Sequence, residues 1–261
     1  TQFGNLHSVK DFSFTIVQDE GIESLPVITL LMFCIVSKLS KLDTLHLTIE
    51  YAVGELLNIG LYEFPVTYLL GILKKAESLQ VFYLSMPSVT FKPIDEIPIL
   101  HSLKSFSLHS QRSSKSGKEE MEYARKTFAM IAQTKLQELN YYDTGSYIDN
   151  DFLGLFCKPN CFRFLQRAVL VSGCPNFDWN TILRMAKLLY SKKSLIEFIL
   201  NVQKWKGSLE GFLECREILE RNKVLRYFLM SSEKARIFKK DYFEEYQIAF
   251  YEDLRLEGDA N

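Results

Sequence analysis

The sequence predicts an α/β fold: a solenoid, or horseshoe, of about eight strand–helix repeats with a parallel sheet on its concave face. Three observations predict it. Apolar residues at relative positions 0, 3 and 5 recur eight times, the copies start 24 to 37 residues apart, and between copies the hydrophobic period changes from 2 to about 3.6. One strand–helix unit cannot bury its apolar face alone, so the units must stack to form a continuous core.

The eight apolar triplets define the predicted strands. In a chain with 47 % hydrophobic residues the triplet alone is common by chance, so two further regularities are needed. Ser or Lys precedes seven of the eight copies, and the last position is Leu in six. The copies are Val9/Phe12/Phe14, Leu42/Leu45/Leu47, Leu79/Phe82/Leu84, Leu103/Phe106/Leu108, Leu136/Leu139/Tyr141, Leu165/Ala168/Leu170, Leu195/Phe198/Leu200 and Val224/Tyr227/Leu229.

Helical periodicity follows most of the strands. It predicts helices over residues 25–39, 66–73, 119–132, 181–190 (with Asp178 as N-cap) and 208–219. Between the third and fourth copies, Pro87, Pro93 and Pro98 favour an extended connection. In residues 234–261, aromatic residues at helical spacing predict a C-terminal helical cap and tail, in the same domain as the solenoid of residues 1–233.

The repeats resemble the leucine-rich repeat superfamily in its longer, helix-bearing variants, over essentially the whole chain. The family pattern continues with Asn or Cys three residues after each triplet, but here that position carries Val17, Glu50, Pro87, Gln111, Thr144, Gly173, Gln203 and Ser232. Irregular curvature is therefore expected. The resemblance to intracellular members implies a non-enzymatic protein–protein interaction scaffold. A narrower version is the substrate-recognition part of an F-box-type ubiquitin ligase receptor, with an adaptor bound through a segment before Thr1.

Composition and charge exclude several classes of protein. Lys and Arg number 31 against 32 Asp and Glu, which excludes a strongly basic nucleic-acid binder. The longest uncharged apolar run, residues 25–37, is shorter than the roughly 20 residues of a membrane span. Five cysteines and no Asn-x-Ser/Thr site predict an intracellular protein, cytoplasmic or nuclear. The start at Thr1, with no Met or signal peptide, is interpreted as that of a fragment.

Motifs that carry chemistry are scarce. There is no Gly-x-Gly-x-x-Gly or Walker motif, so no nucleotide cofactor is expected. Cys157 and Cys161 have no second pair of ligands at zinc-site spacing, and we expect no metal. His46 and His109 are expected on the concave face and are the candidate bases for a less favoured possibility, an α/β-hydrolase-like enzyme.

The concave face is the predicted site of partner binding. Positions 2, 4 and 6 of each repeat line it; they are polar in the first half of the chain and apolar in the second. The predicted partner-binding residues are Tyr83, His109, Tyr142, Val169, Val171, Ile199, Phe228 and Met230. Three possibilities stay open: the C-terminal segment covers this face, a one-residue register slip exchanges the two faces, or the chain is a regulatory repeat domain of a larger sensor protein.

Overall fold

The structure, a computed structural model, describes most of the chain between residues 6 and 250. The described residues are 6–18, 25–51, 63–94, 96, 98–112, 117–144, 147–158, 160–173, 177–189, 192–202, 205–206, 213–215, 217–218, 221, 224–231, 235–240 and 243–250.

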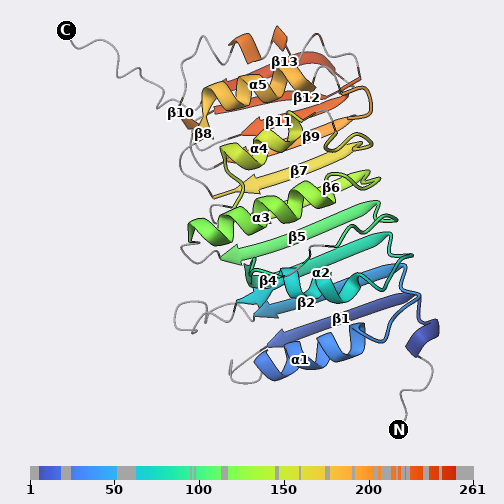
Figure 1. The fold of residues 1–261 in the computed structure, drawn as a ribbon. Helices are drawn as coiled ribbons and strands as arrows, with labels where there is room; N and C mark the ends of the chain where they lie inside the picture. Colours follow the sequence, from blue (N-terminus) through green and yellow to red (C-terminus); the bar gives the residue numbers. More distant parts are fainter. Residues whose placement is uncertain are drawn as a thin grey trace.

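The chain forms an α/β fold around one open, mostly parallel sheet (Figure 1). The eight parallel strands, in spatial order, are β1 (Asp11–Gln18), β2 (Thr44–Tyr51), β4 (Val81–Thr90), β5 (Ser105–Arg112), β6 (Glu138–Asp143), β7 (Arg167–Ser172), β9 (Glu197–Val202) and β11 (Tyr227–Ser231). Two antiparallel strands, β12 (Ala235–Lys240) and β13 (Phe243–Phe250), extend the sheet beyond β11. Each of the eight predicted strands is thus confirmed.

The repeat also predicts how the strands are aligned. Position 2 of each repeat pairs with position 2 of the next from β1 to β9: Asp11 with Thr44, Thr44 with Val81, and so on to Arg167 with Glu197. In the second to seventh repeats, every side chain at positions 0, 3 and 5 is buried. Connections of unequal length therefore leave the alignment of these seven strands unchanged.

The five α-helices labelled in Figure 1 all lie on one side of the sheet. They are α1 (Leu25–Val36), α2 (Val66–Leu73), α3 (Lys118–Ile131), α4 (Asn150–Phe156) and α5 (Trp179–Leu189). Four of them confirm predicted helices to within a few residues. The connection between β4 and β5 contains no helix wherever it is described, and residues 101–102 form a turn. Of the predicted helix over 208–219, only residues 213–215 and 217–218 are described, and they are helical.

Helix α4 was not predicted, because seven residues are too few to display a 3.6-residue period. Its N-terminus carries a local signal: the Asp149 carboxylate accepts a hydrogen bond from the Phe152 N–H at 2.8 Å, as an N-cap does. Three two-residue strands were also missed. β3 (Phe64–Pro65) pairs with the end of β4, and β8 (Phe177–Asp178) pairs with β10 (Trp205–Lys206).

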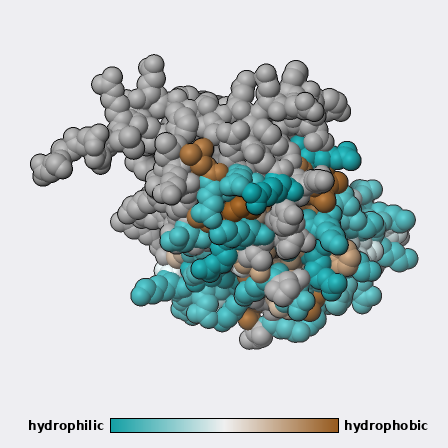
Figure 2. Space-filling model, turned by 90° about the horizontal axis from the view of Figure 1, so that it is seen from above, coloured by the Kyte–Doolittle hydropathy of each residue, from teal (hydrophilic) through white to brown (hydrophobic). Residues whose placement is uncertain are grey.

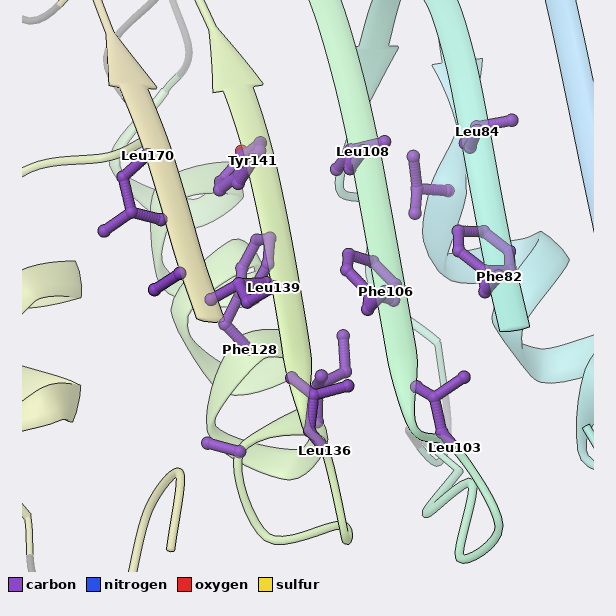
Figure 3. Close-up of a cluster of buried hydrophobic side chains, with 14 of the residues drawn as sticks. Phe82, Leu84, Leu103, Phe106, Leu108, Phe128, Leu136, Leu139, Tyr141 and Leu170 are labelled. Carbon is purple, nitrogen blue, oxygen red and sulfur yellow. The ribbon is translucent and has the colours of Figure 1, made fainter. Parts of the chain in front are cut away.

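The core lies between the sheet and the helices. Leucines and phenylalanines of successive strands form rows that run across the sheet, and Phe128 of α3 reaches into them (Figure 3). The Phe128 ring stacks on Tyr141 at 4.6 Å and meets Phe106 and Phe152 edge-on at 5.8 and 4.9 Å. Seen from above, the described surface is mostly hydrophilic (Figure 2). The apolar residues of the repeat thus pack mainly against those of the neighbouring repeats, inside the core.

The last repeat is shifted by one residue from the predicted register. Tyr227, rather than Arg226, pairs with Glu197. At the start of this repeat Leu225 is 1 % exposed, whereas the predicted core residue Val224 is 36 % exposed. The sequence Val224-Leu225 offers two apolar choices for the first core position, and the pattern alone selected the wrong one.

The predicted C-terminal helix is also wrong. Residues 235–240 and 243–250 form the antiparallel strands β12 and β13. The sequence of β13, Phe-Glu-Glu-Tyr-Gln-Ile-Ala-Phe, fits either period, and its antiparallel pairing with β12 selects the strand. Residues 251–261 of the predicted tail lie outside the described residues.

Candidate functional site

The candidate site is the face of the sheet opposite the helices, which we call the open face. Among the described residues no helix lies on it (Figure 1). Because side chains alternate along a strand, the core positions face the helices and the intervening positions form rows on the open face. The middle row is Ser13, His46, Tyr83, Ser107, Asn140, Val169 and Ile199, and the next is Thr15, Thr48, Ser85, His109, Tyr142, Val171 and Asn201.

Four aromatic side chains form a continuous ladder across strands β2, β4, β5 and β6. The ring centroids of His46 and Tyr83 are 5.2 Å apart, those of Tyr83 and His109 5.1 Å, and those of His109 and Tyr142 4.3 Å. His46 and Tyr83 are direct cross-strand partners, as are His109 and Tyr142, while Tyr83 and His109 meet on the diagonal. Constant register therefore brings together three of the predicted site residues.

Burial favours the neutral form of His109, the half-buried histidine of the ladder. Burial lowers the pKa of His109 from its ordinary value, because removal from water penalises the charged imidazolium. His109 has a tyrosine on each side, so its nearest aromatic neighbours supply no counter-charge. His46 is exposed at the other end. The sequence predicts His46 on this face but omits it from the binding residues; its row position next to Tyr83 was the available signal.

Apolar residues continue the open face beyond the ladder. Val171 is the register partner of Tyr142, and Val169 lies between Asn140 and Ile199. Val171 and Ile199 are half-buried, but Val169 is only 4 % exposed although it faces away from the core. It does not belong to the contiguous core cluster. Neighbouring side chains therefore cover Val169, and Val171 and Ile199 are the accessible part of the predicted apolar strip.

Polar contacts between neighbouring strands fix the rest of this face. The Ser105 hydroxyl donates to the Glu138 carboxylate at 3.2 Å, and the Asn140 amide donates to the Ser107 hydroxyl at 3.0 Å. Arg167 forms an ion pair with Glu197 at 3.1 Å. These side chains hold one another in position across the strands, which favours a preformed surface.

The register of Phe228 and Met230 differs from the predicted one, in which both lie level with the open-face positions of the preceding strand. They are in register with Phe198 and Leu200, whose side chains are buried in the core. The one-residue shift at Leu225 moves both positions into the rows of the helix-covered face. The register slip considered from the sequence is thus real, but it is confined to the last repeat.

The C-terminal strands leave the open face uncovered wherever they are described. They extend the edge of the sheet as β12 and β13 and do not cross this face. The two histidines of the hydrolase hypothesis, His46 and His109, lie on either side of the Tyr83 ring and make no ring contact with each other.

The described cysteines are free thiols: Cys34, Cys157, Cys161 and Cys215. Burial raises the pKa of Cys157 and Cys161, and it raises the pKa of Cys215 to about 12. These three groups are therefore protonated and weakly nucleophilic near neutral pH. No group of three or more potential metal ligands comes together in the part of the chain that the structure describes.

Comparisons with known proteins add no family to this description. No protein-family model matches the chain, and no curated protein matches it. Within the described residues, no helix combines the length and apolar character required to cross a membrane.

Proposed function

We propose that this chain is a protein-interaction module, a leucine-rich-repeat-like solenoid that binds a protein partner on the concave face of its sheet. One observation carries the proposal: the open face presents the ladder His46–Tyr83–His109–Tyr142 directly beside the apolar Val171 and Ile199. The proposed function is non-enzymatic and requires no cofactor.

The chemistry of the ladder supports this reading. Tyrosine gives a large contact area at a small loss of conformational entropy, and it is over-represented among the residues that dominate binding energy at interfaces. The rings are already ordered by contact with each other. A partner that packs on them therefore gives up less side-chain freedom than on an unstructured surface.

A site-specific cross-linking experiment tests the proposal. A photo-activated amino acid replaces Tyr83 on the open face or Lys126 on the exposed surface of α3, and partners captured in cells are identified by mass spectrometry. We expect a protein captured from position 83 but not 126. With that protein purified, Val171→Asp and Tyr142→Ala should each weaken binding at least about tenfold, or 1.4 kcal/mol, while Lys126→Asp should not.

The proposal fails if the purified partner binds all three variants equally well. Circular dichroism of each variant distinguishes a lost contact from a lost fold, because an unfolded variant loses its spectrum as well as its partner.

The narrower version makes the chain the substrate-recognition part of an F-box-type ubiquitin ligase receptor, acting in the cytoplasm or nucleus. It requires an F-box before Thr1 and binding of the F-box adaptor by the full-length protein. A regulatory repeat domain of a larger sensor would instead require a signalling domain in the same reading frame. The full-length coding sequence distinguishes the two.

A further inference from the structure

A second site lies on the helix side of the sheet, away from the open face and independent of the proposed function. A cavity of about 490 Å³ opens between α3, α4 and α5. This volume is in the range of small-molecule pockets. Its polar and sulfur-bearing lining consists of Glu122, Arg125, Lys126, Asn150, Asp151, Cys157, Lys158 and Arg184.

Positive charge from three separate elements converges on this cavity. Arg125 and Lys126 come from α3, Lys158 follows α4, and Arg184 comes from α5. The four cations face two lining carboxylates, Glu122 and Asp151. Counting Asp149 as well, which pairs with Arg125, the cations remain in excess. The polar face of a single amphipathic helix does not explain this cluster, because three separate elements contribute its cations.

The lining carboxylates already have partners, and two of the cations do not. Lys126 pairs with Glu122 at 2.7 Å, and Arg125 pairs with Asp149 at 2.7 Å and Asp151 at 3.0 Å. Lys158 and Arg184 have no acidic partner among the described residues. In the part of the chain that the structure describes, an incoming anion would thus meet two cations that no carboxylate neutralises.

Arg125 adds a fixed positive charge to the cavity wall. Its two terminal nitrogens are held by Asp149 and Asp151. Its Nε is buried and has no hydrogen-bond acceptor in the described part of the chain. A buried donor without an acceptor is destabilising, and the two carboxylates fix the position of this cation beside the cavity.

From this geometry we infer that the cavity binds a small molecule carrying two or more phosphate groups. Guanidinium groups match the oxygens of a phosphate in a forked geometry, and lysine contributes a compact charge. Two phosphates match the two uncompensated cations, and the volume leaves room for more of the ligand. Lys158 and Arg184 contact the ligand, and Arg125, held by Asp149 and Asp151, is a fixed positive charge in the wall.

Cys157 provides a reporter of occupancy. Its half-buried thiol lines the same cavity. Arg184 lies close enough to act on the pKa of this thiol, which burial raises and the positive charge of Arg184 lowers. A ligand held by Arg184 therefore blocks access to the thiol. Cys34, an exposed thiol on α1, is the internal control in the same molecule.

The test uses inorganic pyrophosphate and ADP, without divalent cations, in isothermal titration at low salt. We expect pyrophosphate to bind with a Kd below about 1 mM and to slow alkylation of Cys157 but not Cys34. Lys158→Glu with Arg184→Glu should weaken binding at least about tenfold. Lys38→Glu with Lys41→Glu, which changes the net charge equally on exposed residues near α1, should leave it unchanged.

The two probes distinguish the source of the phosphates. Tighter binding of ADP, lost in the Lys158/Arg184 variant, assigns the cavity to a nucleotide; equal affinity of the two probes assigns it to the phosphate groups alone. The inference is overturned if neither probe binds at millimolar concentration, if Cys157 is not protected, or if both double variants weaken binding equally. None of these results bears on the open face, so the proposed function is tested separately.

Discussion

His109 combines a partly buried position with a titratable group. Its ring lies 4.3 Å from that of Tyr142 and 5.1 Å from that of Tyr83. The two tyrosines shield the imidazole from water without offering a negative charge, so its neutral form is favoured. At the scale of a single residue, the open face therefore contains a group whose charge state and packing are coupled.

This coupling predicts a pH dependence of stability. The folded-state pKa of His109 is below the ordinary value of 6.5, so below pH 6.5 the unfolded chain binds more protons. The resulting contribution is fully present above pH 6.5 and is lost as pH falls toward the folded-state pKa. We expect His109→Gln to reduce the fall in the free energy of unfolding between pH 7.5 and 5.0, measured by urea titration.

The control for this prediction is His101→Gln, at an exposed histidine in a turn. It should retain the wild-type acid dependence. If the His109 variant loses as much stability on acidification as the wild type, the pH dependence arises elsewhere.

A single carboxylate ties helix α3 to two other segments. Glu120 accepts hydrogen bonds from the Thr90 hydroxyl, from the Phe91 N–H at 3.1 Å and from the Tyr147 hydroxyl at 2.5 Å. It sits in the first turn of α3, where negative charge is favourable to the helix. The Glu120 carboxylate thus binds one segment that precedes α3 in the sequence and one that follows it.

At the scale of elements, Phe128 anchors α3 in the core. Phe128 lies beside Phe106 and Tyr141 (Figure 3). Phe91 and Phe152 also pack against its ring. We expect Phe128→Ala to lower the free energy of unfolding by about 3–5 kcal/mol, because it removes a buried ring and leaves a cavity.

Phe164→Ala is the matched control, at a side chain that is 50 % exposed. It should cost less than about 1 kcal/mol. Equal costs in chemical denaturation would show that the packing around Phe128 is not a principal source of stability.

The elements that the sequence predicts are those that combine a long pattern with burial on one side. The helix over 119–132 and the parallel strands from β2 to β9 are of this kind. Helix α4 is too short to reveal a period, and the segment forming β12 and β13 carries aromatic residues compatible with both periods. For β13, pairing with a strand that belongs to no repeat decides the structure, and local sequence does not encode it.

The sequence likewise predicts the residues of the candidate site only where the repeat pattern determines their position. Tyr83, His109, Tyr142, Val171 and Ile199 lie on the open face because the register is constant up to β9. The choice between Val224 and Leu225 depends on which fits beside Leu195, and that is a matter of packing rather than pattern. Burial of Val169 by its neighbours on the same face is likewise a property of the assembled surface.

At the scale of the whole molecule, the core side chains are buried in the middle of the sheet and partly exposed on β1. Phe12, Phe14 and Ile16 are only half-buried, whereas their register partners on β2 are buried. The first described repeat therefore contributes less burial than those that have neighbours on both sides.

This difference predicts unequal costs for the same deletion. Phe82→Ala, in the closed part of the core, should lower the free energy of unfolding by about 3–5 kcal/mol. Phe14→Ala at the open end should cost about 1–2 kcal/mol, because its ring is partly in water already. Urea titration of both variants measures the two costs. Similar values would mean that the β1 end is covered in solution.

The unequal spacing of the repeats has a consequence for how such a chain can change over generations. Connections of quite different length join strands that stay in one alignment. Insertions and deletions on the helix side can therefore accumulate without disturbing the residues that line the open face. A lineage could lengthen or shorten its loops freely while the ladder of rings is inherited intact, and relatives would then be easier to recognise by strand positions than by overall sequence length.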